Sequence, residues 1–208
     1  MLGAPRPVSL RIAALVPLKD PGWGKSRLHR VLNAEERSAL NLEMARRTLE
    51  VCAAVFGAAR TFVVTASSAI GHEASARGMT VVAEPVPGDL NPALRLAGEA
   101  AVAAGAQALL VVPADLARIE AGAIRGVVGA LEQIGQGVVV VADRRGSGTN
   151  LLGIVPARID LFRFGEHSLD KHLQAARDAG LASLVHEDPL LSLDLDLPED
   201  LVLWRGDP

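Results

Sequence analysis

Short apolar runs alternate with longer amphipathic segments along most of the chain. The apolar runs are rich in Val, Ile and Leu and predict buried strands, whereas the longer segments have apolar residues at helical spacing. Strands are predicted at residues 10–18, 60–65, 79–83, 107–112 and 137–142, and helices at 35–54, 68–77, 91–104 and 121–134. This alternation predicts an α/β fold: a Rossmann-like, mostly parallel sheet flanked by helices.

The alternation changes after residue 142. A Gly-rich loop at 143–150 precedes a strand at 151–155 and a helix at 168–179, and short strands are expected at 184–186 and 193–195 before a last helix from Pro198. These elements are expected to add antiparallel or mixed strands to the same sheet. No internal repeat or linker interrupts the pattern, so one domain over residues 1–208 is predicted.

Composition narrows the class of protein. Half of the 208 residues are hydrophobic but only 3% are aromatic, which suits a sheet packed against Ala-rich helices. The net charge of −3 argues against a general nucleic-acid or membrane surface. The single Cys52 excludes an internal disulfide and a multi-cysteine metal site.

Neither a signal peptide nor a membrane span is predicted, so we expect a cytoplasmic protein. The sequence leaves the oligomeric state open, with a homodimer as one candidate.

Asp115 directly follows the apolar run that ends at Val112. Ligands in open α/β sheets bind at the carboxyl ends of the strands, where an aspartate can hold a metal ion. The alternative is a helix N-cap for the segment near Ile119, or an Asx turn.

The first loop, residues 18–28, follows a strand and precedes a helix. It contains two glycines and the cations Lys19, Lys25 and Arg27, which suit a polyphosphate. Neither the Walker pattern nor the dinucleotide pattern is present. The alternative is a solvated basic loop.

Two segments could bind a small anionic substrate. Thr149 and Asn150 follow glycines that allow close approach of the backbone, although a tight hairpin explains the glycines equally well. Gly165 precedes Ser168, a predicted N-cap, and a helix start binds anions well. His172 is on the same helical face as Ser168, although a structural histidine is an equal alternative.

Asp194 and Asp196 alternate along a predicted strand and point to the same side. Adjacent carboxylates repel unless a cation lies near them, so Asp194 with Asp115 predicts a Mg²⁺ site. Asp196 is given a structural or supporting role. The alternative is that Asp196 or Glu199 caps the helix that begins at Pro198.

Taken in order, these motifs resemble one family, the phospholactate/phosphoenolpyruvate guanylyltransferases of coenzyme F420 biosynthesis. The resemblance runs from about Ile12 to Leu201. The matching motifs are Val16-Pro17-Leu18-Lys19, Lys25-Ser26-Arg27-Leu28, Glu84 before a proline, Leu90-Asn91, Pro113-Ala114-Asp115-Leu116, Asp143-Arg144, Gly148-Thr149-Asn150, Phe164-Gly165 with Ser168 and His172, and Asp194-x-Asp196 before Pro-Glu-Asp.

The resemblance implies a nucleotidyltransferase fold of the glycosyltransferase-A type, as in nucleotide-diphospho-sugar transferases. It also implies transfer of GMP from GTP to a small phosphorylated carboxylic acid, with release of pyrophosphate. Thr149, Gly165 and Ser168 match the phospho-acid site, beside Asn150 and His172, and Asp115 and Asp194 match the metal ligands. The residues expected to bind the nucleotide are Pro17, Lys19, Lys25, Arg27, Glu84, Asn91 and Pro113. We expect Lys25 and Arg27 to assist Asp115 in catalysis.

The sequence departs from the family pattern at Ala117, at Leu197 and at the segment Pro21-Gly22-Trp23, which affects the edges of the site. Two other functions stay open. One is a nucleotidyltransferase acting on a molybdopterin or a sugar phosphate, and the other is a nucleotide-binding module without catalysis.

Overall fold

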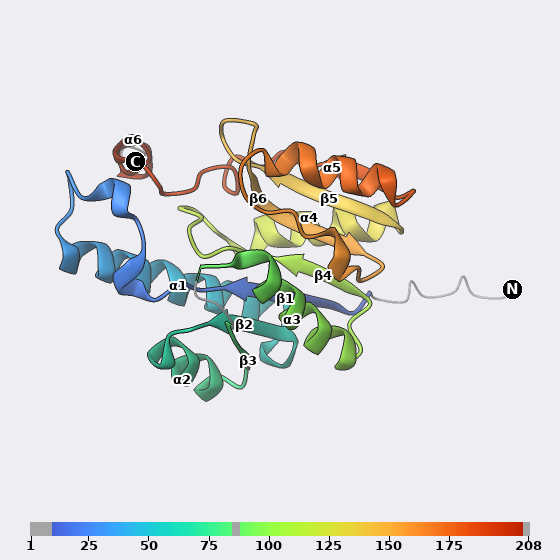
Figure 1. Cartoon of the computed structure of the whole chain (residues 1–208), viewed down its shortest axis with the longest axis horizontal. Coiled ribbons are helices and arrows are strands. Elements are labelled where there is room, and N and C mark those ends of the chain that lie inside the picture. Colours follow the sequence, from blue (N-terminus) through green and yellow to red (C-terminus); the bar gives the residue numbers. More distant parts are fainter. Residues whose placement is uncertain (1–9, 85–87, 206–208) are drawn as a thin grey trace, which may run out of the picture.

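The computed structural model describes residues 10–84 and 88–205 (Figure 1). The start of the chain, where no signal peptide was predicted, and the middle of the loop at 84–90 lie outside these residues. The strands are β1 (Ile12–Pro17), β2 (Thr61–Thr65), β3 (Thr80–Ala83), β4 (Ala108–Val111), β5 (Gly137–Ala142), β6 (Thr149–Val155) and β7 (Ala182–Val185). The helices are α1 (Ala34–Phe56), α2 (Ser68–Ala76), α3 (Leu90–Ala103), α4 (Ala121–Ile134), α5 (Ser168–Asp178) and α6 (Pro198–Arg205).

The strands form one seven-stranded sheet in the order β3-β2-β1-β4-β6-β5-β7. Only β6, among the described strands, runs antiparallel to its neighbours β4 and β5, and the other paired strands are parallel. The predicted mixed, mostly parallel sheet is therefore confirmed. Because β6 is reversed, its first residue, Thr149, lies beside Ala142 at the carboxyl end of β5.

Helices cover both faces of the sheet (Figure 1). Alternate residues of each strand face opposite sides, so Ala14 and Val16 pack with α1, α2 and α4, whereas Ala13 and Leu15 pack with α3 and α5. Two layers of apolar side chains thereby enclose the parallel strands, as their continuous apolar sequences require.

A third, smaller apolar cluster lies outside the sheet. Its buried members come from the segment after β1, from α1, from the turn after β4 and from the C-terminal segment: Leu28, Leu32, Leu40, Met44, Ala117, Leu193, Leu195 and Leu201. This cluster fixes the first loop and the C-terminal segment against each other beyond the carboxyl ends of the strands.

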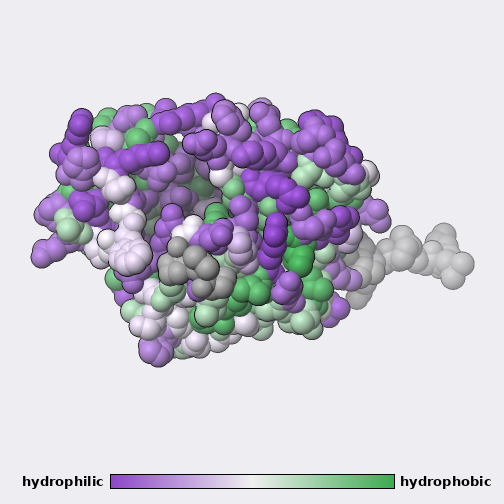
Figure 2. Space-filling view, in the orientation of Figure 1, coloured by the Kyte–Doolittle hydropathy of each residue, from purple (hydrophilic) through white to green (hydrophobic). Residues whose placement is uncertain are grey.

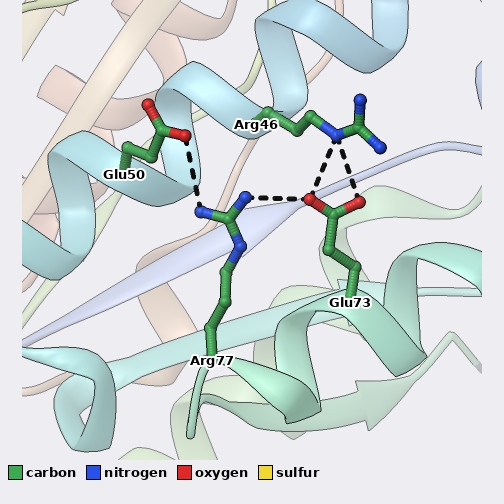
Figure 3. Close-up of polar contacts among 4 residues, drawn as sticks. All are labelled: Arg46, Glu50, Glu73 and Arg77. Carbon is green, nitrogen blue, oxygen red and sulfur yellow. Dashed lines mark hydrogen bonds and ion pairs between the residues drawn. The ribbon is translucent and has the colours of Figure 1, made fainter.

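A surface network of charged side chains joins α2 to α1 (Figure 3). Glu73 accepts a hydrogen bond from Arg46 Nε at 3.1 Å and one from Arg77 Nη2 at 2.8 Å, and Arg77 also pairs with Glu50 at 3.7 Å. The hydrogen bond from Arg46 is the main cause that holds the pKa of Glu73 below its usual value. Surface pairs of this kind contribute at most about 1 kcal/mol each, so the network only supports the helix packing.

Two local predictions are wrong, and one of the alternatives is excluded. Residues 193–195 do not form a strand, because Asp194 makes only an isolated bridge with Leu116. The N-cap of α5 is His167, at φ 53°, and Ser168 is the first helical residue. Asp115 does not cap the next helix, since α4 begins at Ala121 with Glu120 as its N-cap.

Within the described residues, no helix combines the length and the apolar character needed to cross a membrane.

Gly153 in β6 provides a test of the packing between the sheet and α4. A Cβ added there would lie 2.6 Å from Leu131 Cδ1 and 2.9 Å from its Cγ. Gly153→Ala should therefore lower the free energy of unfolding by about 1–3 kcal/mol, measured by urea denaturation.

Gly129→Ala on α4 is the matched control, because no atom lies within 4 Å of a Cβ added at this position. It should raise the stability by about 0.5–1 kcal/mol through helix propensity. Equal effects of the two substitutions would show that the close contact with Leu131 does not limit the core.

Candidate active site

Two carboxylates meet at the carboxyl edge of the sheet. Asp115 follows β4, and its carbonyl oxygen accepts a hydrogen bond from Leu195 N at 2.9 Å, while Ala117 N donates to Leu193 O at 3.0 Å. The bridge between Leu116 and Asp194 lies between these two bonds. The backbone thus places Asp194, from the C-terminal segment, beside Asp115 at the end of β4.

The pKa values of both carboxyl groups are raised above their usual range. Burial, followed by the charge of Asp115, raises the pKa of Asp194 to about 6. Burial also raises the pKa of Asp115, opposed first by the positive charge of Lys25. Two half-buried carboxylates that repel each other form a site that a cation would stabilise.

Lys25 supplies one fixed positive charge at this site. It has a left-handed backbone conformation, with φ 57°, and its Nζ donates a hydrogen bond to the carbonyl oxygen of Leu195. A non-glycine residue in this conformation is strained by about 1 kcal/mol or more, which is typical of functional sites. Lys19 is exposed and also favours the ionised form of Asp115.

A pocket of about 130 Å³ opens beside Asp194 and Asp196. Three arginines and four aspartates contribute most of its lining: Arg27, Arg144, Arg145, Asp143, Asp194, Asp196 and Asp200. Figure 2 shows hydrophilic residues around a hollow on this face of the molecule, near the carboxyl ends of β1 and β4. Of these, Arg27 was predicted to bind the nucleotide, whereas no role was predicted for Arg144, Arg145 or Asp200.

Asp200 is buried and connects two parts of the pocket. Its Oδ1 accepts from Arg144 Nη2 at 2.9 Å, and its Oδ2 accepts from the backbone N–H groups of Asp196 at 3.1 Å and Leu197 at 2.7 Å. Asp200 therefore accepts hydrogen bonds from the backbone N–H groups at the start of α6. This capping role had been considered for Asp196 or Glu199. A carboxylate at the third helical position after Leu197-Pro198 is the sequence signal that could have identified it.

The loop between β5 and β6 is folded around Asp143. Asp143 Oδ1 accepts from the backbone N–H groups of Ser147 and Gly148, both at 2.8 Å. A Cβ at position 148 would lie 3.1 Å from the carboxylate, which explains the glycine there. The carbonyl of Ser147 accepts from Leu169 N at 3.2 Å, so this hairpin is attached to the start of α5.

The predicted phospho-acid residues gather at this junction. Thr149 Oγ1 lies 2.9 Å from His172 Nδ1, and His172 Nε2 accepts from Arg163 N at 2.9 Å. Ser168 is buried at the start of α5, and Gly165, at φ 131°, is exposed in the preceding turn. Burial, with a smaller effect of Arg163, lowers the pKa of His172 to about 4.

Two residues that were predicted to contact ligands form hydrogen bonds with the protein backbone instead. Asn150 is buried and donates to Leu191 O at 2.9 Å. The side-chain amide of Asn91 bonds both the backbone N–H and the carbonyl of Phe164, each at 2.9 Å. Both asparagines therefore position segments of the site.

Among the other predicted nucleotide-binding residues, Glu84 accepts from Gly88 N at 2.9 Å. Pro17 and Pro113 are half-buried at the carboxyl ends of β1 and β4.

The part of the chain that the structure describes contains no group of three or more His, Cys, Asp or Glu residues arranged to hold a metal ion. Mg²⁺ that accompanies a nucleotide needs only one or two carboxylates, because phosphate oxygens and water complete its shell. The pair Asp115 and Asp194, with pKa values raised partly by nearby carboxylates, fits that donor set.

The family model described as "Guanylyl transferase CofC like" matches residues 12–204. The chain belongs to this family. The CofC-like guanylyltransferase is 38% identical to the phosphoenolpyruvate guanylyltransferase of Rubrobacter xylanophilus, over 92% of each chain. It is 30% identical to the 3-phospho-D-glycerate guanylyltransferase of Colwellia psychrerythraea, over 93% of this chain and 91% of the relative.

Solved structures confirm the fold of the CofC-like guanylyltransferase. A nucleotide-diphospho-sugar transferase described as putative, from Desulfovibrio desulfuricans, aligns with a TM-score of 0.70 at 18% identity, over 95% of this chain and 87% of that one. A Mycobacterium tuberculosis protein solved in complex with manganese gives 0.62 at 16% identity, over 96% and 100%. The predicted fold is confirmed, and the family makes this chain a nucleotidyltransferase.

The lowered pKa of His172 predicts a loss of stability in acid. Because the folded pKa of about 4 lies below the usual histidine pKa of 6.5, the folded state disfavours protonation and binds fewer protons than the unfolded chain between these values. This stability is complete above pH 6.5 and is lost as the pH falls to 4. The stability lost over this pH range should amount to about 2–3 kcal/mol.

The measurement is urea denaturation between pH 8 and pH 4, with His172→Gln as the comparison. The variant should lose about 2–3 kcal/mol less than the native protein over this range. Parallel losses in the two proteins would contradict the lowered pKa.

Proposed function

We propose that this guanylyltransferase joins GMP from GTP to a small phosphorylated three-carbon acid and releases pyrophosphate, as a step in coenzyme F420 biosynthesis. The observation that carries the proposal is the backbone pairing that brings Asp115 and Asp194 together beside Lys25. The names of the relatives support an acceptor such as phosphoenolpyruvate or 3-phospho-D-glycerate, and the resemblance adds 2-phospho-L-lactate.

The proposed chemistry needs no general base. A phosphate monoester is largely ionised at neutral pH, because its second pKa is about 6, and one of its oxygens can attack the α-phosphorus of GTP directly. The new phosphorus–oxygen bond forms as the bond to the β-phosphate oxygen breaks, and pyrophosphate leaves with the bonding electrons. The absence of a Ser–His–Asp set from the proposed site is consistent with this route.

Repulsion between the two anions is the main barrier. Asp115 and Asp194 would hold Mg²⁺, which supplies positive charge against phosphate oxygens when bound. Lys25 adds a charge fixed by its bond to Leu195, and Arg27 adds one in the pocket. Aligning the acceptor and the triphosphate while neutralising their charge is the work of phosphoryl-transfer sites in general.

The experiment that tests this function is competition among acceptors. Phosphoenolpyruvate, 2-phospho-L-lactate and 3-phosphoglycerate are offered together with GTP and Mg²⁺, and products are identified by mass spectrometry. We expect the guanylylated derivative of phosphoenolpyruvate to dominate, although differences of this size give only about 1–3 kcal/mol of discrimination. A dominant 3-phosphoglycerate product would overturn this preference, and no product from any acid would overturn the proposed function.

Asp115→Asn tests the proposed metal ligand. The variant should lose at least about 100-fold in turnover at saturating Mg²⁺, because a carboxylate that holds charge near the reacting phosphates is removed. Its melting temperature should not fall, since the folded state already disfavours the ionised form of Asp115. Pyrophosphate release at saturating substrates and the melting temperature are the two measurements.

Asp178→Asn on α5 is the matched control, because its carboxylate bonds only to Gln174 at the surface in the described structure. It should keep native turnover. Near-native pyrophosphate release by Asp115→Asn would show that Asp115 is not the ligand.

A further inference from the structure

His172 links three segments around the proposed acid pocket. It lies on α5 and is 1% exposed. Its Nδ1 is 2.9 Å from Thr149 Oγ1 on β6, and its Nε2 is 2.9 Å from Arg163 N in the segment before α5. Its ring also forms a T-shaped contact with the ring of Phe164, with the centroids 4.8 Å apart and the planes at 71°. Each ring nitrogen therefore has a protein partner.

The chemistry of these partners fixes the direction of each hydrogen bond. The backbone N–H of Arg163 can only donate, so Nε2 must accept and carries no proton. A neutral imidazole has one N–H, which must then be on Nδ1. Nδ1 can therefore only donate, to Thr149 Oγ1 and to the backbone of Ser168, and the hydroxyl of Thr149 keeps its own hydrogen to donate elsewhere. Burial keeps the ring neutral, since the pKa of His172 falls to about 4.

A further set of contacts holds the ring in place through Phe164. Asn91 at the start of α3 bonds both backbone groups of Phe164 at 2.9 Å, and Phe164 packs against the ring. The hydroxyl of Thr149 is therefore oriented by a chain of contacts that begins on α3 and ends on β6.

We propose that His172 is a positioning residue, which fixes the Thr149 hydroxyl as a hydrogen-bond donor to an anionic oxygen of the acceptor acid. The inference rests on the proposed function. It assigns His172 no contact with the acid, because both ring nitrogens are occupied. Its substitution should therefore affect the acid and leave GTP unaffected.

Thr149→Val removes the hydroxyl and nearly keeps the shape of the side chain. Loss of a hydrogen bond to a charged group should raise KM for the acid about tenfold or more. KM for GTP should stay within about twofold of the native value.

Two substitutions of His172 separate its two nitrogens. His172→Gln can still accept from Arg163 N through an oxygen near the place of Nε2, but it loses the donor to Thr149. His172→Asn can place an amide N–H near Nδ1, but it loses the acceptor. We expect His172→Gln to raise the acid KM by about the same factor as Thr149→Val, and His172→Asn to keep most of the acid affinity.

The double variant Thr149→Val/His172→Gln tests whether the two residues act together. If His172 acts through Thr149, the double variant should match Thr149→Val alone within about twofold, since coupled residues are not additive. The control is His72→Gln, an exposed histidine on α2, which should match the native enzyme in both KM values. Additive losses, or a rise in KM for GTP of the same size as that for the acid, would overturn the proposal.

The tautomer can be measured without any turnover. In the native protein labelled with ¹⁵N-histidine, NMR at pH 7 should show His172 with a protonated Nδ1 and a bare Nε2. A proton on Nε2 would overturn the proposal even if His172→Gln failed to fold. Absence of product from the native enzyme with every acid would overturn the proposed function together with this inference. A native acid KM in His172→Gln would overturn this inference alone.

Discussion

The geometry of the site depends on the backbone pairing between residues 115–117 and 193–195. Two hydrogen bonds and the bridge at Leu116 hold the C-terminal segment against the end of β4. The pairing places Asp115 and Asp194 together although both are partly buried and repel each other. The side chains alone would not favour this arrangement, because the two carboxylates repel each other. The backbone hydrogen bonds and the small apolar cluster must therefore offset the repulsion.

The reversed strand β6 also shapes the site. The parallel strands bring only their carboxyl ends to the active edge, whereas β6 brings its amino end. Thr149 therefore lies at the same edge as Asp115, and the hairpin that precedes it reaches the start of α5 through Ser147. The metal side and the acid side of the proposed site are thus built from strands of opposite direction in one sheet.

Much of this arrangement could be predicted from the sequence. The apolar runs that form β1, β2, β4 and β5 predict buried strands, because continuous Val, Ile and Leu segments must be covered on both faces. The Mg²⁺ site at Asp115 and Asp194 was predicted from the adjacent carboxylates and from the family resemblance, and it stays a prediction. The failure at residues 193–195 has a physical cause: alternation predicts an extended segment, but it cannot show whether a partner strand continues beside it.

The residues that were missed or given another role are those whose partners are distant in the sequence. Asp200 has a recognisable local role at the start of α6, yet its bond to Arg144 depends on the β5–β6 loop. Asn91 occurs in a motif that resembles the nucleotide site, but both ends of its amide are bonded to Phe164. A motif shows that a residue is needed at a site, and only the hydrogen-bond partners distinguish residues that are free to meet a ligand from residues that hold them in place.

This distinction explains why the site contains so many occupied polar groups. Asp200, Asn91, Asn150 and His172 each hold backbone or side-chain atoms of a neighbouring segment at 2.7–3.1 Å. An enzyme that must bring two polyanions together benefits from charges and donors that are already oriented, because reorienting them during the reaction would raise the barrier. In a site built largely from loops, with few regular hydrogen bonds of its own, that orientation has to come from buried polar side chains. The positioning residues therefore support the proposed chemistry of Asp115 and Lys25, which would face the phosphates.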